Sequence, residues 1–201
     1  MGRFTKILKD KAMRKLTSDA EVNKKVYERS KKVFEESKRK LLQDFISHPV
    51  TKEIKAGPDA SNVSNTIVGP GNLYSFIGFE NGSDPIGIVY DYLNTSTYLS
   101  ANRKARVVKK TKDRVYLGFK VNAPNMEQLA AISRMPWEPG SWLFKIEKGM
   151  SGLGHYIYQK YIKGSRSGSG IQASGRVRTG LFKRTQYMSA ILNTFKKNFT
   201  K

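Results

Sequence analysis

The chain contains no cysteine and only two histidines, His48 and His155, among its 201 residues. The lack of thiols excludes disulfides, thiolate metal sites and cysteine nucleophiles, and two histidines are too few for a histidine-based metal centre. No apolar run approaches the roughly 20 residues that span a bilayer, and no hydrophobic signal-peptide core follows Met1. We therefore expect a protein without a membrane span, located inside a cell or in an assembled particle.

Carboxylates are also scarce, and their distribution divides the chain into three blocks under a formal net charge of +21. Residues 1–55 contain 16 basic residues (Lys or Arg) and 8 acidic residues (Asp or Glu). Residues 56–102 contain no basic and 4 acidic residues, and residues 103–201 contain 21 basic and 4 acidic residues. The last acidic residue is Glu147, and the 54 residues after it carry eleven Lys or Arg. Because uncompensated like charge repels itself in a compact state, this pattern predicts an anionic partner: phosphate, an acidic protein or an anionic membrane.

The middle block, residues 56–102, has no Lys or Arg although the pI of the chain is about 10.1. We expect this block to face something other than the anionic partner, either the core of the chain or another protein. Its apolar residues Leu73, Tyr74, Phe76 and Phe79 are our candidates for a contact between subunits. The simpler alternative is a buried pair of strands and turns.

The composition predicts a folded chain with one core. Hydrophobic residues make up 38% of the sequence and aromatic residues 11%, which is too much apolar material for a disordered basic protein. We expect a basic amphipathic arm over residues 1–17 and a single α+β domain over residues 18–201. The first 16 residues, with six Lys or Arg, suit a membrane-surface helix or a transit peptide, but we favour an arm that becomes ordered on assembly.

A long helix is predicted from Ser18 to about Ser47. Ser18 and Glu21 have the spacing of a capping box, in which each side chain satisfies a backbone N–H at the start of a helix. Apolar residues then recur at intervals of three, four and seven, lysines occupy the other face, and Pro49 follows the expected end. At about 1.5 Å per residue this helix is roughly 40 Å long. Its lysines are expected in solvent.

Shorter elements follow in the second half of the chain. Residues 105–110 and 114–121 flank a polar connection, and apolar residues alternate with the other side chains over 114–121, which predicts an antiparallel hairpin. We also expect a helix at 85–93 capped by Asp84, a helix opening at Asn125, a strand over 142–146 and a C-terminal helix over 187–199. The predicted fold class is α+β: a long N-terminal helix packed on a small antiparallel sheet, with a C-terminal helix.

Candidate catalytic groups are lacking. The carboxylates of Glu127, Glu138 and Glu147 have no partner at catalytic spacing, and Gly168-Ser169-Gly170 lacks the lysine of a phosphate-binding loop. We expect no enzymatic activity, no cofactor and no metal. His48, directly before Pro49, is expected to be a helix-end feature, and His155 a packed side chain among tyrosines.

A basic loop rich in Gly and Ser is predicted over residues 163–180. We expect its cations and those just after it to contact the backbone of a polyanion; these candidates are Arg166, Arg176, Arg178, Lys183 and Arg184. The alternative is a solvated loop without a partner. Because the aromatic residues stand at core spacings, we expect no base readout; the aromatic residues assigned to the core are Tyr116, Phe119, Trp142 and Phe144.

Two segments carry a family resemblance. SRSGSGIQASGRVRTGLFKRTQYMSAILNTF, residues 165–195, and GNLYSFIGFENGSDPIG, residues 71–87, resemble neck or tail-completion proteins of tailed bacteriophages. The resemblance implies a non-enzymatic virion protein that forms a homo-oligomeric ring between portal and tail. It also implies contacts with the adjoining portal, adaptor and tail proteins, with the basic surface facing either the backbone of double-stranded DNA in the channel or an acidic neighbour.

Two other functions fit the same composition. A sequence-nonspecific RNA-binding protein, such as a ribosome-associated factor, would use the basic C-terminal region equally well. A membrane-surface protein would be anchored through residues 1–16.

Overall fold

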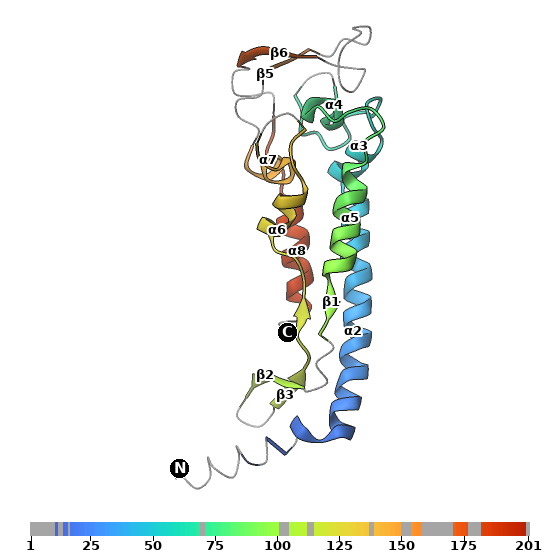
Figure 1. Cartoon of the computed structure of the whole chain (residues 1–201), viewed down its shortest axis with the longest axis vertical. Coiled ribbons are helices and arrows are strands. Elements are labelled where there is room, and N and C mark those ends of the chain that lie inside the picture. The colour runs from blue at the N-terminus through green and yellow to red at the C-terminus, as the bar shows by residue number, and fades with distance from the viewer. Residues whose placement is uncertain are drawn as a thin grey trace. The chain divides into compact units, whose positions relative to one another are not determined.

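The chain folds as an α+β protein with a long N-terminal helix, small two-stranded antiparallel sheets and a C-terminal helix, as predicted (Figure 1). The structure is a computed structural model of the chain, and contact density divides it into two compact units. Unit 1 comprises residues 1–39 and 96–123, and unit 2 comprises residues 40–95 and 124–201. The described residues are 11, 14–15, 17–68, 71–100, 105–111, 115–136, 139–149, 154–157, 171–176 and 182–199, with 154–157 and 171–176 described as backbone alone.

Helix α2, Ala20–Ser47, begins one residue later than the predicted capping box implies. The capping side chain is that of Asp19, whose Oδ1 accepts the backbone N–H groups of Glu21 at 2.9 Å and Val22 at 3.0 Å. Ser18, the predicted cap, instead donates its hydroxyl to the Lys15 carbonyl at 3.0 Å. The prediction of a Ser18 cap is therefore wrong, because a carboxylate one position along meets two free N–H groups.

Unit 1 contains α2 as far as Arg39 together with two strand pairs. Strand β1, Tyr98–Leu99, pairs antiparallel with β4, Val121–Asn122, and β2, Arg106–Lys110, pairs antiparallel with β3, Val115–Gly118. The predicted hairpin is thus confirmed.

Two contacts fix α2 against these strands. The Asn23 amide accepts the N–H of Ala105 at 2.7 Å and donates to the Thr17 and Asp19 carbonyls, each at 2.8 Å. The rings of Tyr27 and Phe119 meet edge to face, with centroids 5.2 Å apart.

Unit 2 is mostly helical and holds the larger core. Its helices are α3 Pro49–Lys55, α4 Leu73–Ile77, α5 Pro85–Ser96, α6 Met126–Ile132, α7 Trp142–Lys148 and α8 Met188–Lys197. Strands β5, Gly154–Ile157, and β6, Ile171–Arg176, pair antiparallel. The largest fully buried side chains include Phe45, Tyr74, Trp142 and Tyr187.

Local end signals place most of these helices as predicted. Gly87 donates its N–H to Asp84 Oδ1 at 2.8 Å at the start of α5, and Asn125 and Gln128 form a reciprocal capping box on α6. His48 is the N-cap of α3: its Nδ1 accepts the N–H of Val50 at 3.3 Å. The prediction that His48 is a helix-end feature is confirmed.

The predicted strand over 142–146 is wrong, because these residues form helix α7. Ser141 caps the helix by accepting the N–H of Phe144 at 3.3 Å. Trp142, Leu143 and Ile146 are buried, which is a helical spacing, whereas Phe144 is only half-buried. Three apolar residues at alternate positions fit a strand, but Leu143 between the first two also faces the core.

The candidate subunit-contact residues lie inside unit 2. Leu73, Tyr74, Phe76 and Phe79 are 0%, 2%, 5% and 4% exposed. The Phe79 and Trp142 rings meet edge to face at 5.8 Å, and the Tyr74 hydroxyl donates to the Glu80 carbonyl. These four side chains are buried within unit 2, so the structure corrects that assignment in favour of the buried alternative, formed by a short helix and turns.

Candidate polyanion-binding surface

Positive charge is concentrated in unit 1. Its two segments, residues 1–39 and 96–123, contain 21 Lys or Arg and 7 Asp or Glu, a net charge of +14. Unit 2 contains 16 Lys or Arg and 9 Asp or Glu, a net charge of +7, although it is twice as long. Unit 1 is therefore more basic than unit 2, which contains the predicted polyanion-contacting residues Arg166, Arg176, Arg178, Lys183 and Arg184.

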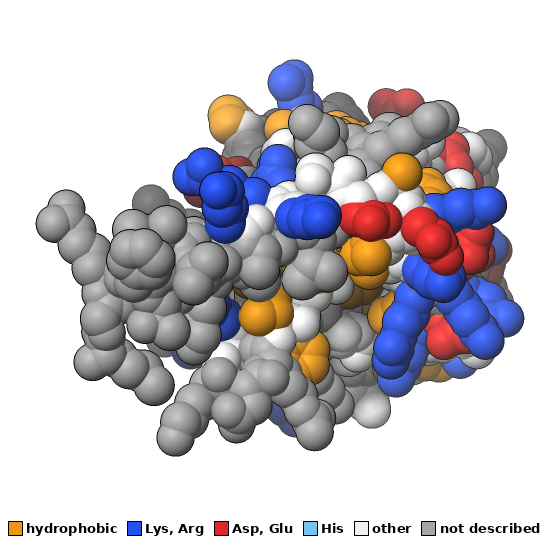
Figure 2. Space-filling view, turned by 90° about the horizontal axis from the view of Figure 1, so that it is seen from below, with side chains coloured by type: hydrophobic (Ala, Val, Ile, Leu, Met, Phe, Trp, Pro, Cys, Tyr) orange, Lys and Arg blue, Asp and Glu red, His pale blue; other side chains and the backbone are white. Residues whose placement is uncertain are grey.

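Helix α2 presents part of this charge to solvent. Two of its lysines form exposed ion pairs one turn along the helix: Lys25 with Glu21 at 2.8 Å and Lys31 with Glu35 at 3.7 Å. Four further exposed cations in the unit 1 part of α2 have no ion pair among the described residues: Lys24, Arg29, Lys32 and Arg39. Figure 2 shows Lys and Arg side chains at the surface with a few carboxylates among them. These cations are free to meet an external anion.

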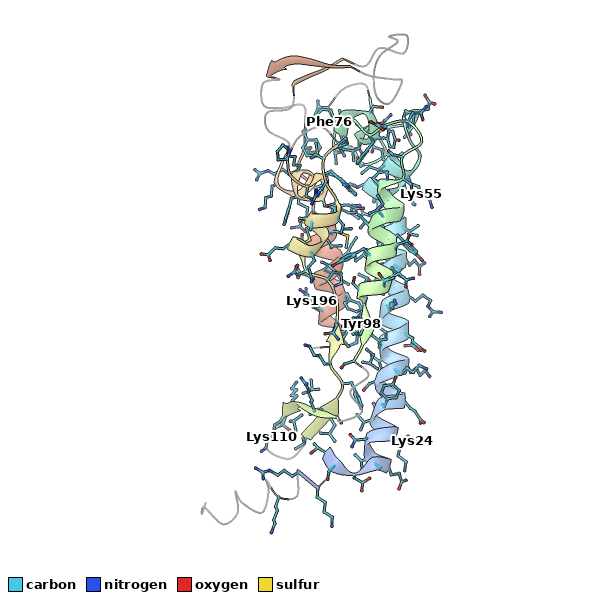
Figure 3. The ribbon with its side chains drawn as sticks, viewed as in Figure 1. Lys24, Lys55, Phe76, Tyr98, Lys110 and Lys196 are labelled. Carbon is cyan, nitrogen blue, oxygen red and sulfur yellow. The ribbon has the colours of Figure 1, made fainter. Side chains whose placement is uncertain are left out.

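The β2–β3 hairpin supplies the other part. All five residues of β2 are exposed, among them Arg106, Lys109 and Lys110. Lys109 Nζ lies 6.0 Å from the centre of the Tyr116 ring, and Figure 3 shows Lys110 on the hairpin and Lys24 on α2. Tyr116 is 44% exposed, so its assignment to the core is wrong, whereas Phe119 and Trp142 are buried as predicted.

The register of the hairpin gives its two faces different chemistry. Val107 lies opposite Leu117 and Lys110 opposite Val115, and a bulge falls between Val107 and Lys109. Because side chains alternate along a strand, one face carries Arg106, Lys109 and Tyr116, and the other carries Val107, Lys110, Val115 and Leu117. Val108, the bulge residue, lies against Gly118 on the first of these faces. We call these the cationic face and the aliphatic face.

The candidate residues chosen from the sequence are only partly described. Arg166 and Arg178 lie outside the described residues, and Arg176 lies in β6, where its backbone pairs with Gly154. Lys183 and Arg184 are exposed ahead of α8, where the N–H of Lys183 donates to the Thr66 carbonyl at 2.7 Å.

The predicted loop over 163–180 is corrected at residues 171–176, which form β6 paired with β5. Gly and Ser lower strand propensity, but Ile171 and the alternation after it allow pairing when a partner strand is present.

The sequence itself contains a signal that the hairpin is exposed. Residues 103–114 hold seven Lys or Arg and a single carboxylate, at Asp113. A strand pair with this density of charge cannot bury both of its faces without leaving cations unpaired in the interior. Charge density inside the predicted hairpin therefore indicated an exposed ribbon.

A separate cluster of titratable groups lies in unit 2. The Tyr187 hydroxyl hydrogen-bonds with Thr51 Oγ1 at 2.5 Å, and the Tyr187 and His48 rings are 4.7 Å apart. Burial lowers the pKa of His48, against the opposing effects of a backbone hydrogen bond with Gln186 and the charge of Glu147. Burial also raises the pKa of Tyr187 far above its ordinary value. Glu147 accepts the N–H of Ser189 at 2.7 Å, so this cluster joins α3, α7 and α8.

Among the described residues, no three His, Asp or Glu side chains are grouped so that they could hold a metal ion. In the same part of the chain no helix has the length and apolar character needed to cross a bilayer. No protein family, characterised protein or solved structure matches this chain.

Proposed function

We propose that this chain is a non-enzymatic structural protein of a tailed-phage virion, a ring-forming neck or tail-completion adaptor between portal and tail. Its basic surface faces DNA or an acidic neighbour. The observation that supports the proposal best is the net charge of +14 in unit 1, with exposed cations on both α2 and the hairpin. The phage setting itself rests on the resemblance of residues 71–87 and 165–195 to neck and tail-completion proteins.

The charge pattern suits binding that is indifferent to sequence. Lys24, Arg29 and Lys32 are long, exposed side chains on one helix, which can neutralise phosphates without reading base edges. Tyr116 is the exposed aromatic side chain beside a hairpin lysine, and it can lie against a sugar or base without defining a sequence. A ring around a DNA channel requires such a surface.

The virion location is tested by finding the chain in particles. Purified phage particles from the source genome would be analysed by mass spectrometry and imaged, with particles lacking this gene product as the control. The proposal expects the chain in a stoichiometry of several copies per particle at the neck, and tailless heads when the gene is deleted. Absence from purified particles would contradict it.

A binding assay on the purified full chain distinguishes a preference for duplex DNA from a preference for other polyanions. Fluorescence anisotropy with a labelled 30-base-pair duplex and with a single-stranded RNA of equal charge would be measured over a salt series. The proposal expects duplex binding with a log-log salt slope of about −0.9 for each neutralised phosphate. Tight binding to RNA with weak duplex binding would instead indicate an RNA-binding protein.

A further inference from the structure

A hollow of about 230 Å³ opens on unit 2, and all of its lining residues belong to unit 2. Its apolar lining includes Phe79, Trp142, Pro85 and Ile88. Ile88 is 57% exposed, which is unusual for a large aliphatic side chain beside an apolar hollow. Such a combination marks a surface that another apolar group can cover.

Two carboxylates, Glu80 and Asp84, line the same hollow. Asp84 Oδ1 accepts the N–H of Gly87, and neither carboxylate has an ion pair among the described residues. Arg134 also lines the hollow, where its Nε donates to the Ala131 carbonyl at 3.4 Å. Among its described lining residues the hollow therefore carries one excess negative charge: both carboxylates come from residues 56–102, which contain no Lys or Arg, and Arg134 offsets one of them.

The aliphatic face of the hairpin has the complementary chemistry. Val107 is 44% exposed and Val115 is 38% exposed. Contact with a polyanion would not bury these aliphatic side chains against apolar groups. Lys110 stands on the same face, directly opposite Val115. This face thus combines aliphatic surface with a cation, whereas the hollow combines apolar surface with two carboxylates and one arginine.

We propose that the hollow in unit 2 of one copy receives the aliphatic face of the β2–β3 hairpin of a second copy, with Lys110 placed against Glu80 and Asp84. A chain of net charge +21 repels its own copies unless a negative surface meets a positive one, and residues 56–102 are the block with negative net charge. Because the two surfaces differ, the contact is heterologous and closes into a ring or extends into a filament. This inference rests on the proposed ring-forming adaptor, whose subunit contact it names.

The test is a charge exchange in the full-length chain, with self-association measured by analytical ultracentrifugation over a concentration series. Glu80→Lys and Lys110→Glu should each weaken self-association by about tenfold or more, and an equimolar mixture of the two variants should recover association. Asp59→Lys is the matched control, since Asp59 is an exposed carboxylate of the same block outside the hollow, and it should associate like the unaltered chain.

Several results would overturn the inference. These are an unaltered chain that stays monomeric at every concentration, a Glu80→Lys variant that associates like the unaltered chain, and a mixture that fails to recover. Ile88→Ser is an independent test that does not change the charge. It should also weaken association, because it removes exposed apolar surface beside the hollow, and it should leave the core intact because Ile88 is exposed. Duplex binding by Glu80→Lys should persist, so that loss of association and loss of polyanion binding are distinguished.

Discussion

Glu53 holds Leu73 in place: its carboxylate oxygen Oε1 accepts the Leu73 N–H at 2.7 Å, and both residues are fully buried. The second oxygen, Oε2, accepts the N–H of Ser64 at 2.8 Å. One side chain of α3 thereby fixes both the loop that precedes α4 and the first residue of α4. The buried block that contains Leu73 depends on this carboxylate.

Glu53→Gln should lower the free energy of unfolding by about 2 kcal/mol, because an amide NH₂ replaces one acceptor and faces a backbone donor. Urea denaturation followed by circular dichroism measures the change. Glu36→Gln is the control, since Glu36 is exposed on α2, and it should alter stability by less than about 0.5 kcal/mol. Equal stability of the two variants would show that Glu53 does not fix the loop.

Tyr187→Phe should also destabilise the fold, by about 1–3 kcal/mol, because it leaves the buried Thr51 hydroxyl without its partner. The double variant Tyr187→Phe with Thr51→Val removes both polar groups together. Its stability should recover toward that of the unaltered chain, which denaturant titration of all four chains can measure as a double-mutant cycle. Additive losses would contradict a direct hydrogen bond between the two side chains.

His48 should make stability depend on pH on the acid side of neutrality. Burial holds its pKa below the ordinary value of 6.5, so the unfolded chain takes up a proton at a higher pH than the folded chain does. The stabilising contribution is therefore complete above about pH 6.5 and is lost as the pH falls toward the folded-state pKa. Protonation of Nδ1 also removes the acceptor that caps α3.

Thermal unfolding at pH 5.0 and pH 7.5 tests the histidine, with His48→Asn as the comparison because asparagine caps a helix without titrating. The unaltered chain should lose more stability than the variant between these pH values. If both lose the same amount, the dependence comes from other groups and the assignment to His48 fails.

Local signals in the sequence were enough to predict α2, α5, α6, α8 and the hairpin. A cap, a proline or a sustained apolar period each acts within a few residues, so no knowledge of tertiary contacts is needed. The Ser18 cap failed by one residue because Asp19 competes for the same N–H groups. Boundaries of this kind are decided by geometry that spacing alone does not specify.

Burial was harder to predict than secondary structure. Tyr116 and Phe119 lie three residues apart in the same predicted strand, but Phe119 is buried and Tyr116 is exposed. The Phe119 ring packs against the Tyr27 ring of α2. Which of the two is covered depends on where a distant helix lies, and a strand pattern cannot show this. Exposed cations without an ion pair among the described residues therefore include side chains of the hairpin and of α2, which the strand pattern does not single out.

The most direct test of the account is duplex DNA binding by two sets of alanine variants, measured by anisotropy over a salt series. Replacing Lys24, Arg29 and Lys32 together, all exposed in unit 1, should weaken binding at least about tenfold and reduce the salt slope by about two to three. Replacing Lys183 and Arg184, which are exposed in unit 2, should weaken binding less. Unchanged affinity and slope in the first set would contradict the claim that unit 1 binds the polyanion.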